Sequence, residues 1–435
     1  MVECLSKGKQ ICFCGRKHST NIEELCIQKG CLEQLHLYVK KRKIKKILLL
    51  CRAEDAEKGH AVQKLLKNTG AVLQKLYIDT DEITSEIQYA GLMMMRTDMQ
   101  TDLAVIVGSG EWINTSRYLC DRLGIPAALV LTGITEINFC ASWIAVREEG
   151  IPHFHKIAEP AAVYADPQIA STINEEEAIS AGLAFYGTWI ALYEWRLSHL
   201  ITEEYYCPYL EQEFLRMSET AAVQPFSDFI TVMEMQASVS LLITYADDPA
   251  LISGSYHLLK EFWSRKIPAF CWDERSKKES GIRCLALDAA YCLASRIGNM
   301  VGDRWKVFEE MNPEYRENKI RSLYGNQADF VLNLEKKTGK NSREKVFVRR
   351  RKTESCYREI QKIDYLLPAG DEIRAVKKQC FSLKRDGMLS EEEFYEGLLF
   401  AGDMVNRYNV LQFLYDMGRL DQAAVQMKTL CRKYQ

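Results

Sequence analysis

The 435-residue sequence predicts an α/β domain with a parallel sheet, followed by an all-α domain. Two observations support this fold class. Between residues 45 and 165, short runs of β-forming apolar residues alternate with amphipathic segments long enough to be helices. After about Asp166 the β-type runs become rare, and apolar residues recur at helical spacing. We therefore expect an N-terminal domain over residues 1–165 and a helical domain over residues 166–435.

The N-terminal part has the pattern of successive βαβ units. Apolar runs predict strands at 46–51, 74–78, 103–107 and 127–131. Amphipathic periodicity predicts helices at 57–69, at 83–95 and from residue 111 onward. Strands joined through helices of this length are parallel, and the helices cover both faces of the sheet. Ligands of such sheets bind at the carboxyl ends of the strands.

The second part of the chain shows helical periodicity with only short β-like patches. Apolar spacing predicts helices at 174–193, 211–220, 226–245, 254–263, 282–297, 311–323 and 391–417. The polar stretch Lys336–Ser342 interrupts this pattern, and we expect it to be a loop between helices.

The charge balance argues against polyanionic partners. The formal net charge is −2 at pH 7, which gives no overall attraction to nucleic acid or to an anionic membrane. Two basic runs, Lys40–Lys46 and Arg349–Lys352, are expected to be solvated faces or loops. No apolar stretch reaches the roughly 18 residues of a membrane span. We expect no nucleic acid partner and no membrane span, and a homo-oligomer is possible.

The fifteen cysteines are scattered, and the N-terminus lacks a secretory signal pattern. We therefore expect a reducing, cytoplasmic location rather than a disulfide framework. Cys12 and Cys14, with His18 close by, resemble half of a zinc knuckle, but a knuckle needs a second pair of ligands. The nearest candidates, Cys26 and Cys31, lie where the pattern predicts a strand and a helix start. This placement favours free thiols over structural zinc.

A glycine-containing turn follows the strand predicted at 103–107. Gly108-Ser109-Gly110 would let the backbone approach a phosphate, and the next helix would present unpaired N–H groups to it. Glycines also serve tight turns, and a full dinucleotide fingerprint has more of them. Glu111 would repel a pyrophosphate unless its carboxylate points away. The turn is thus either a phosphate cradle or a purely structural connection.

Few histidines are placed for metal or acid–base chemistry. His257 lies on a predicted helix with Glu261 four residues later on the same face, so the pair could hold a divalent ion or be an ordinary helix-face hydrogen bond. His153 and His155 would share one side of an extended segment, but they lie in a Pro-flanked connection that we expect to be exposed. No convincing Ser-His-Asp or Cys-His grouping is present.

Motifs along nearly the whole chain carry a family pattern. They are CFCGRKHSTNIEELCIQKGCLEQL, SRYLCDRLGIP, AEPAAVYADPQIAS, EWRLSHLITEEYYCP, LLPAGDEI and RYNVLQFLYDMGRLD. These motifs resemble the sn-glycerol-1-phosphate dehydrogenases, relatives of the iron-dependent alcohol dehydrogenases, glycerol dehydrogenases and dehydroquinate synthases. The resemblance implies a Rossmann-like nucleotide domain, a helical domain and an active-site cleft between them. It also implies NAD or NADP as cofactor, a zinc or nickel ion, and a small phosphorylated polyol or ketose as ligand.

The resemblance also implies roles for individual residues. The positions that would contact the nucleotide are Gly108, Ser109, Gly110, Asn114 and Thr132. Asn138 stands where the family has a substrate-contacting Asp, and Asn114 also replaces an acidic residue. His257 matches one metal-binding His. The metal-binding Asp of the family falls at Phe185 or Tyr186, and its second His falls near Ser280, so two of three metal ligands are missing.

Three functions remain open on this basis. The first is an NAD(P)-dependent oxidoreductase that interconverts dihydroxyacetone phosphate and sn-glycerol 1-phosphate, as in phospholipid metabolism. The second is a pseudoenzyme that keeps the site as a nucleotide-binding, ligand-binding or scaffolding module. The third is a metal-independent reaction on a phosphorylated ligand. Loss of metal ligands typically abolishes metal catalysis, which favours impairment.

Overall fold

The computed structural model describes residues 12–78, 87–98, 100–148, 151–221, 226, 228–266, 272–300, 311–381 and 389–431. The chain divides into two compact units. The first contains Met1–Glu148, Pro152–Ala181 and Pro208–Pro249. The second contains Glu149–Ile151, Gly182–Cys207 and Ala250–Gln435.

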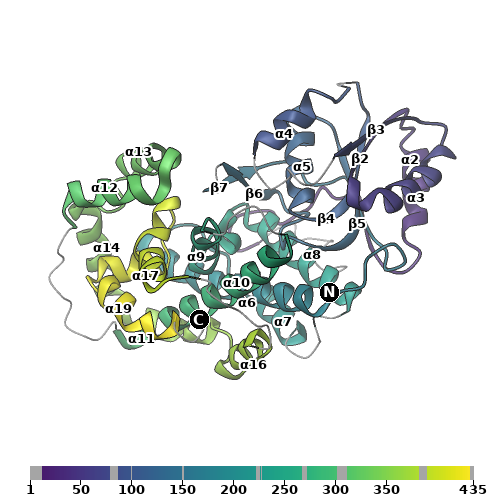
Figure 1. The fold of residues 1–435 in the computed structure, drawn as a ribbon. Coiled ribbons are helices and arrows are strands. Elements are labelled where there is room, and N and C mark those ends of the chain that lie inside the picture. Colours follow the sequence, from purple (N-terminus) through teal and green to yellow (C-terminus); the bar gives the residue numbers. More distant parts are fainter. Residues whose placement is uncertain are drawn as a thin grey trace. The chain divides into compact units, whose positions relative to one another are not determined.

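The first unit is built on a six-stranded sheet with the strand order β1-β8-β5-β4-β2-β3, in which all neighbouring pairs are parallel. The strands are β1 (Glu24–Ile27), β2 (Lys46–Arg52), β3 (Val72–Ile78), β4 (Leu103–Gly110), β5 (Ala127–Thr135) and β8 (Ala162–Ala165). Helices α2 (Leu32–Lys41) and α3 (Ala56–Lys67) cover one face, and α4 (Ile87–Met94) and α5 (Glu111–Leu123) cover the other (Figure 1).

The central strands form the core of this unit. Residues Leu48–Cys51 of β2, Ala104–Val107 of β4 and Ala128–Leu131 of β5 are each 0% exposed, because helices cover both faces of the sheet. In the register, Leu49 pairs with Val105, so the apolar runs lie side by side. The predicted fold class is confirmed: a parallel α/β domain followed by a helical part.

The structure contains strands that periodicity did not reveal. β6 (Trp143–Glu148) and β7 (Ile151–Lys156) form a separate two-stranded sheet. The expectation that His153 and His155 lie in an exposed connection is wrong, because both are on β7 and half-buried. The His155 ring lies 4.9 Å from the Tyr118 ring of α5, which shields it from solvent.

One helix of the first unit corrects the expectation about apolar stretches. α8 (Phe229–Ala246) is 18 residues long with a mean hydropathy of 1.3, so its length and composition suffice for a membrane span. However, 78% of it is buried inside the protein. Asp228 caps its N-terminus by accepting a hydrogen bond from the Thr231 backbone at 2.8 Å. These features are typical of a core helix, and a cytoplasmic location stays a prediction.

The second unit is helical. It contains most of α6 (Glu175–Thr202), whereas α7 (Pro208–Ala221) belongs to the first unit. Its other helices are α9 (Ser255–Ser264), α10 (Trp272–Ala294), α11 (Ile297–Met300), α12 (Pro313–Tyr324), α13 (Ala328–Thr338), α14 (Arg343–Ser355), α15 (Tyr357–Lys362), α16 (Gly370–Phe381), α17 (Glu391–Phe400), α18 (Val410–Asp416) and α19 (Leu420–Cys431). The predicted continuous helix at 391–417 is wrong, because a 3-10 turn at Ala401–Met404 ends α17.

A buried carboxylate organises the centre of this unit. Glu194 of α6 is 2% exposed. Its Oε2 accepts a hydrogen bond from the Ser255 backbone N–H at 2.8 Å, and its Oε1 accepts one from the Val410 N–H at 3.0 Å. One side chain therefore satisfies unpaired N–H groups at the starts of both α9 and α18. Gly254 leaves room for it, since a Cβ there would lie 2.2 Å from Oε2.

The basic run Arg349–Lys352 is not simply solvated, which corrects the expectation from the sequence. Arg349 of α14 is 9% exposed and Asp416 of α18 is 0% exposed. The guanidinium donates from Nε to Oδ2 at 2.6 Å and from Nη2 to Oδ1 at 2.7 Å, which makes a bidentate ion pair. Arg351, in contrast, is exposed.

Candidate functional site

The turn Gly108-Ser109-Gly110 joins β4 to α5 and requires both of its glycines. A Cβ at Gly108 would lie 2.5 Å from the Trp112 ring, whose Nε1 donates to the Val107 carbonyl at 3.1 Å. Gly110 has φ 63° and ψ −150°, a region that only glycine occupies readily. A Cβ on Gly110 would meet nothing within 4 Å, so space above the turn is open.

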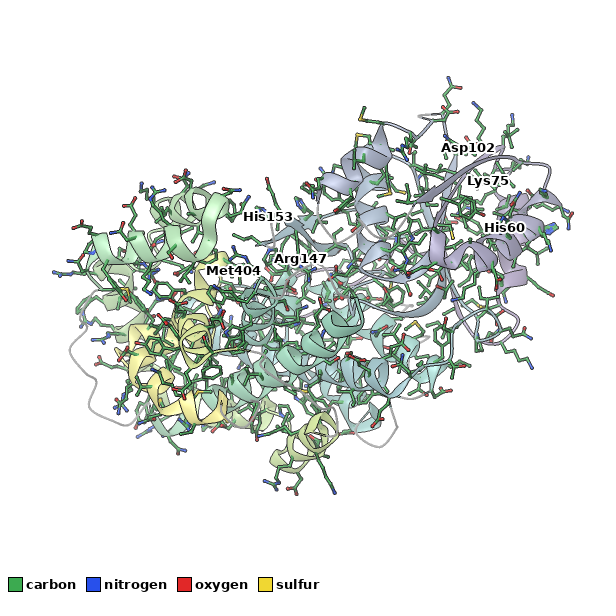
Figure 2. All side chains as sticks on the ribbon, in the orientation of Figure 1. His60, Lys75, Asp102, Arg147, His153 and Met404 are labelled. Atoms are coloured by element: carbon green, nitrogen blue, oxygen red, sulfur yellow. The ribbon has the colours of Figure 1, made fainter. Side chains whose placement is uncertain are left out.

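The carboxylate of Glu111, the first residue of α5, is neutralised by a partner. Arg147 of β6, labelled in Figure 2, places Nη1 2.6 Å from Glu111 Oε1. The repulsion that the sequence suggested for a bound phosphate is therefore offset by this ion pair. The turn and the first N–H groups of α5 keep the shape and polarity of an anion-binding helix start.

Two of the residues singled out from the sequence are in direct contact. Asn114 of α5 donates from Nδ2 to Oδ1 of Asn138 at 2.9 Å, and Asn138 donates from Nδ2 to the Trp143 carbonyl at 3.2 Å. Both asparagines are buried, at 3% and 5% exposure. The structure thus joins the predicted nucleotide residue Asn114 to the predicted substrate residue Asn138 by a fixed amide pair.

Arg117, which the sequence did not single out, holds the segment that carries Asn138. It is 2% exposed, and its guanidinium donates to the carbonyls of Asn138 (3.3 Å), Phe139 (2.8 Å), Ala141 (2.5 Å) and Ala158 (3.2 Å). Burial lowers the pKa of Arg117 to about 10, so the group is still charged at neutral pH. A buried arginine on the polar side of a helix pattern has no distinctive sequence signal.

Thr132 belongs to a polar network at the carboxyl ends of β2 and β5. Its Oγ1 donates to Oδ1 of Asp55 at 3.0 Å, and Asp55 is only 4% exposed. Arg52 and Lys58 neutralise this carboxylate at 3.1 and 3.2 Å. Arg52 also donates to Ser109 Oγ at 3.4 Å, so the network connects Thr132 to the glycine turn. Sequence reasoning missed Arg52, Asp55 and Lys58.

His257, the predicted metal ligand, lies on α9 in the second unit. Its Nδ1 is buried and has no hydrogen-bond partner among the described residues. Burial, reinforced by Lys260, lowers the pKa of the imidazole to about 3. Glu261, the neighbour considered from the sequence, forms an ion pair with Lys260 at 2.8 Å. In the described part of the chain, His257 belongs to no group of three or more His, Cys, Asp or Glu side chains that could hold an ion.

Aromatic side chains stand where the resemblance implies a metal-binding carboxylate. The Phe185 and Tyr186 rings are 5.6 Å apart, and Tyr186 stacks on Trp189 at 6.0 Å. Tyr256 packs against the same helix, since a Cβ at Gly187 would lie 1.9 Å from its ring. Neither these residues nor the buried Ser280 supplies the missing carboxylate or imidazole. Among the described residues, the side chains at these positions do not fit the three-ligand divalent centre that the resemblance implies.

The lowered pKa of His257 predicts that the folded protein loses stability in acid. The folded pKa of His257, about 3, lies below the ordinary value of 6.5, so the unfolded chain binds the proton first. The stability that this group contributes is fully present above pH 6.5 and is lost as the pH falls toward 3, on the order of 4–5 kcal/mol. His257→Asn should remove this part of the pH dependence in thermal unfolding. His60→Asn, at an exposed position labelled in Figure 2, should keep it; equal profiles for His257→Asn and wild type would contradict the expectation.

Comparison with known proteins agrees with this architecture. A family model described as iron-containing alcohol dehydrogenase matches residues 26–172. A glycerol-1-phosphate dehydrogenase [NAD(P)+] of Bacillus licheniformis is 21% identical over 346 residues, which cover 76% of this chain and 82% of that protein. One of Geobacillus stearothermophilus is 21% identical over 282 residues, covering 60% of this chain and 67% of that protein.

A solved structure extends the match in fold to almost the whole chain. The iron-containing alcohol dehydrogenase of Corynebacterium glutamicum superposes with a TM-score of 0.55 at 13% identity, covering 94% of this chain and 96% of that chain. The family model covers the sheet with the glycine turn, and the relatives carry the similarity into the helical part. The chain is therefore similar to iron-containing alcohol dehydrogenases over its sheet, and to glycerol-1-phosphate dehydrogenases over about three quarters of its length, 76% in the Bacillus licheniformis comparison.

Proposed function

We propose that this protein is a glycerol-1-phosphate dehydrogenase-like protein that binds NAD or NADP but is impaired in metal-dependent hydride transfer. The observation that carries the proposal is the state of His257. A catalytic divalent ion is held by three protein ligands, and here one buried imidazole is accompanied by aromatic rings and a serine. Among the described residues, the donor set around His257 does not support metal-dependent hydride transfer.

Nucleotide binding is supported by the first unit. The glycine turn at 108–110 leaves open space at Gly110, and α5 presents its N-terminal N–H groups beside it. Glu111 is neutralised by Arg147, which removes the main electrostatic objection. Ser109 and Thr132 are linked through Arg52 and Asp55, so the candidate contacts are held in one network.

The second ligand that we propose is a small phosphorylated polyol or ketose. The names of the curated relatives support this class, since they act on glycerol 1-phosphate. Asn138, at the position of the substrate contact implied by the family, is neutral and is fixed by Asn114 and Trp143. In this role the amide would bind a hydroxyl or carbonyl oxygen without adding charge.

An active dehydrogenase is the second candidate, favoured by the activity that the relatives' names state. The two candidates differ in turnover and in the dependence of bound metal on His257. We expect no oxidation of NADH by dihydroxyacetone phosphate, even with added zinc or nickel. We also expect the metal content of His257→Asn to equal that of wild type. Turnover together with a divalent ion that His257→Asn loses would establish the active enzyme and overturn impairment.

Nucleotide binding is tested by fluorescence titration with NADH and NADPH. Gly110→Ala should weaken binding at least about tenfold, because a Cβ is strained at this backbone conformation and distorts the turn. Gly124→Ala is the control: it changes another glycine of positive φ, 68°, which lies in the left-handed helical region at the opposite end of α5. Equal binding by Gly110→Ala and Gly124→Ala, or no binding by wild type, would refute the nucleotide site.

A further inference from the structure

Four side chains of metal-ligand type meet at a place remote in sequence from His257. The ligand atoms of Cys12, Cys14, His18 and Cys207 all lie within 4.8 Å of one another. Three come from the segment that precedes β1 in the first unit. The fourth, Cys207, directly precedes Pro208, the first residue of α7. Among the described residues, these four form the one group of three or more His, Cys, Asp or Glu side chains whose ligand atoms lie close enough together to hold a metal ion.

The distances between the ligand atoms suit an ion with tetrahedral coordination. With Zn–S bonds of about 2.3 Å and Zn–N bonds of about 2.0 Å, the ligand atoms of a tetrahedral site lie roughly 3.5–3.8 Å apart. Cys14 Sγ and His18 Nε2 are 3.4 Å apart, close to this separation. Cys12, His18 and Cys207 are buried, at 6%, 0% and 0% exposure, and Cys14 is half-buried. The site would therefore be closed on most sides by protein.

The imidazole of His18 is oriented as a ligand. Its Nδ1 lies 3.0 Å from the Tyr245 carbonyl oxygen, which can only accept, so Nδ1 carries the proton. The Nε2 lone pair is then free of a proton and faces Cys14 Sγ. Metal-binding histidines commonly donate their second ring nitrogen to a carbonyl in this way. The His18 ring also stacks on Tyr209 of α7 at 5.8 Å, which fixes it beside Cys207.

The backbone around the first two cysteines is shaped to present their sulfur atoms. Gly15, with φ 81°, closes a turn by donating its N–H to the Cys12 carbonyl at 3.0 Å. The Arg16 backbone N–H donates to Cys14 Sγ at 3.4 Å, which stabilises a thiolate there. Arg16 also donates from Nη1 to the Ala246 carbonyl at 2.8 Å and anchors the turn to the end of α8.

Simpler explanations account for only part of this cluster. A thiolate–imidazole nucleophile would need one cysteine and His18 and would leave the other two thiols unexplained. A disulfide could pair two of the sulfur atoms but would give His18 no role, and Cys12, Cys14 and Cys207 are in the reduced form in the structure. Cys26 and Cys31, considered from the sequence, lie outside the group, and Cys31 Sγ donates to the Cys26 carbonyl at 3.4 Å.

We propose that Cys12, Cys14, His18 and Cys207 bind one zinc ion in a closed structural site. Three thiolates and one imidazole form a ligand set that zinc takes in structural sites, with no position left for water or substrate. The ion would fasten the segment before β1 to the start of α7. This proposal does not depend on the proposed function, since it concerns neither the nucleotide turn nor His257.

The test is metal analysis of the full chain, purified under reducing conditions without chelator. We expect about one zinc per chain in wild type and in His257→Asn. Cys207→Ser and His18→Asn should lose most of it, whereas Cys140→Ser, at a buried free thiol outside the group, should retain it. Replacement by cobalt should give thiolate-to-cobalt charge-transfer bands and strong tetrahedral d–d bands in wild type, which Cys207→Ser should lack.

A variant that exchanges one ligand for another controls for zinc loss that is caused by misfolding. His18→Cys keeps four ligands, so it should retain zinc and the tetrahedral cobalt spectrum while shifting the charge-transfer bands. The proposal is overturned if reduced wild type holds neither zinc nor cobalt, or if Cys207→Ser retains as much zinc as wild type. A disulfide between two of these cysteines in protein isolated without reductant and without zinc would also overturn it.

Discussion

Arg349→Met should lower the free energy of unfolding of the helical unit by about 3–5 kcal/mol, because it leaves the carboxylate of Asp416 buried without its counter-charge. Asp416 is fully buried, and the two short bonds from Arg349 neutralise it. Gln412 adds one hydrogen bond at 3.1 Å, which does not replace a charge. For a unit of this size the loss corresponds to a fall in Tm of roughly 10 °C.

Two further variants make the Arg349 experiment specific. Arg351→Met, two residues away on α14 at an exposed position, should change stability by less than about 0.5 kcal/mol. The double variant Arg349→Met with Asp416→Leu should recover most of the loss, since an apolar pair of similar volume can replace a buried ion pair. Thermal and urea unfolding measure all three; an Arg349→Met protein as stable as Arg351→Met would contradict the expectation.

Arg117→Met should destabilise the first unit by about 3–5 kcal/mol and should weaken ligand binding in the protein that still folds. The four carbonyls that Arg117 satisfies, at 138, 139, 141 and 158, would lose their charged donor. Asn138 would then lose its fixed position relative to Asn114. Arg117 acts through the segment of residues 138–141, whose carbonyls it binds, and is therefore a positioning residue.

The readouts separate positioning by Arg117 from simple stability. Arg117→Lys keeps a charge and part of the donor set, so we expect it to fall between wild type and Arg117→Met in both unfolding and binding of the phosphorylated ligand. Arg122→Met, an exposed change on the same helix, should leave both unchanged. If Arg117→Met lowers Tm but binds dihydroxyacetone phosphate as wild type does, the positioning role is wrong.

Local hydrophobic pattern was sufficient for the main architecture. The predicted strands at 46–51, 103–107 and 127–131 correspond to β2, β4 and β5, because strands buried on both faces read as continuous apolar runs. β6 and β7 lack such runs, since they form a small separate sheet with one side less covered. The boundary between residues 165 and 166 stays a prediction.

The polar interior was harder to foresee. Arg117, Asp55 and Arg349 are charged residues that a helix or loop pattern assigns to the surface, and only their tertiary partners show that they are buried. Cys207 is likewise separated from Cys12, Cys14 and His18 by the entire sheet in sequence, so spacing rules could not pair them. The roles of Gly108–Gly110, Asn114, Thr132, Asn138 and His257 stay predictions until the titrations are done.

The double cap made by Glu194 has a consequence for how α6 and α9 are kept together. α6 carries Phe185 and Tyr186, where the resemblance implies a metal-binding carboxylate, and α9 carries His257. The hydrogen bond from the Ser255 backbone N–H to Glu194 joins these two helices directly. Amide hydrogen exchange at Ser255 and Val410 should consequently be slow and should open together, without any response to added divalent ions.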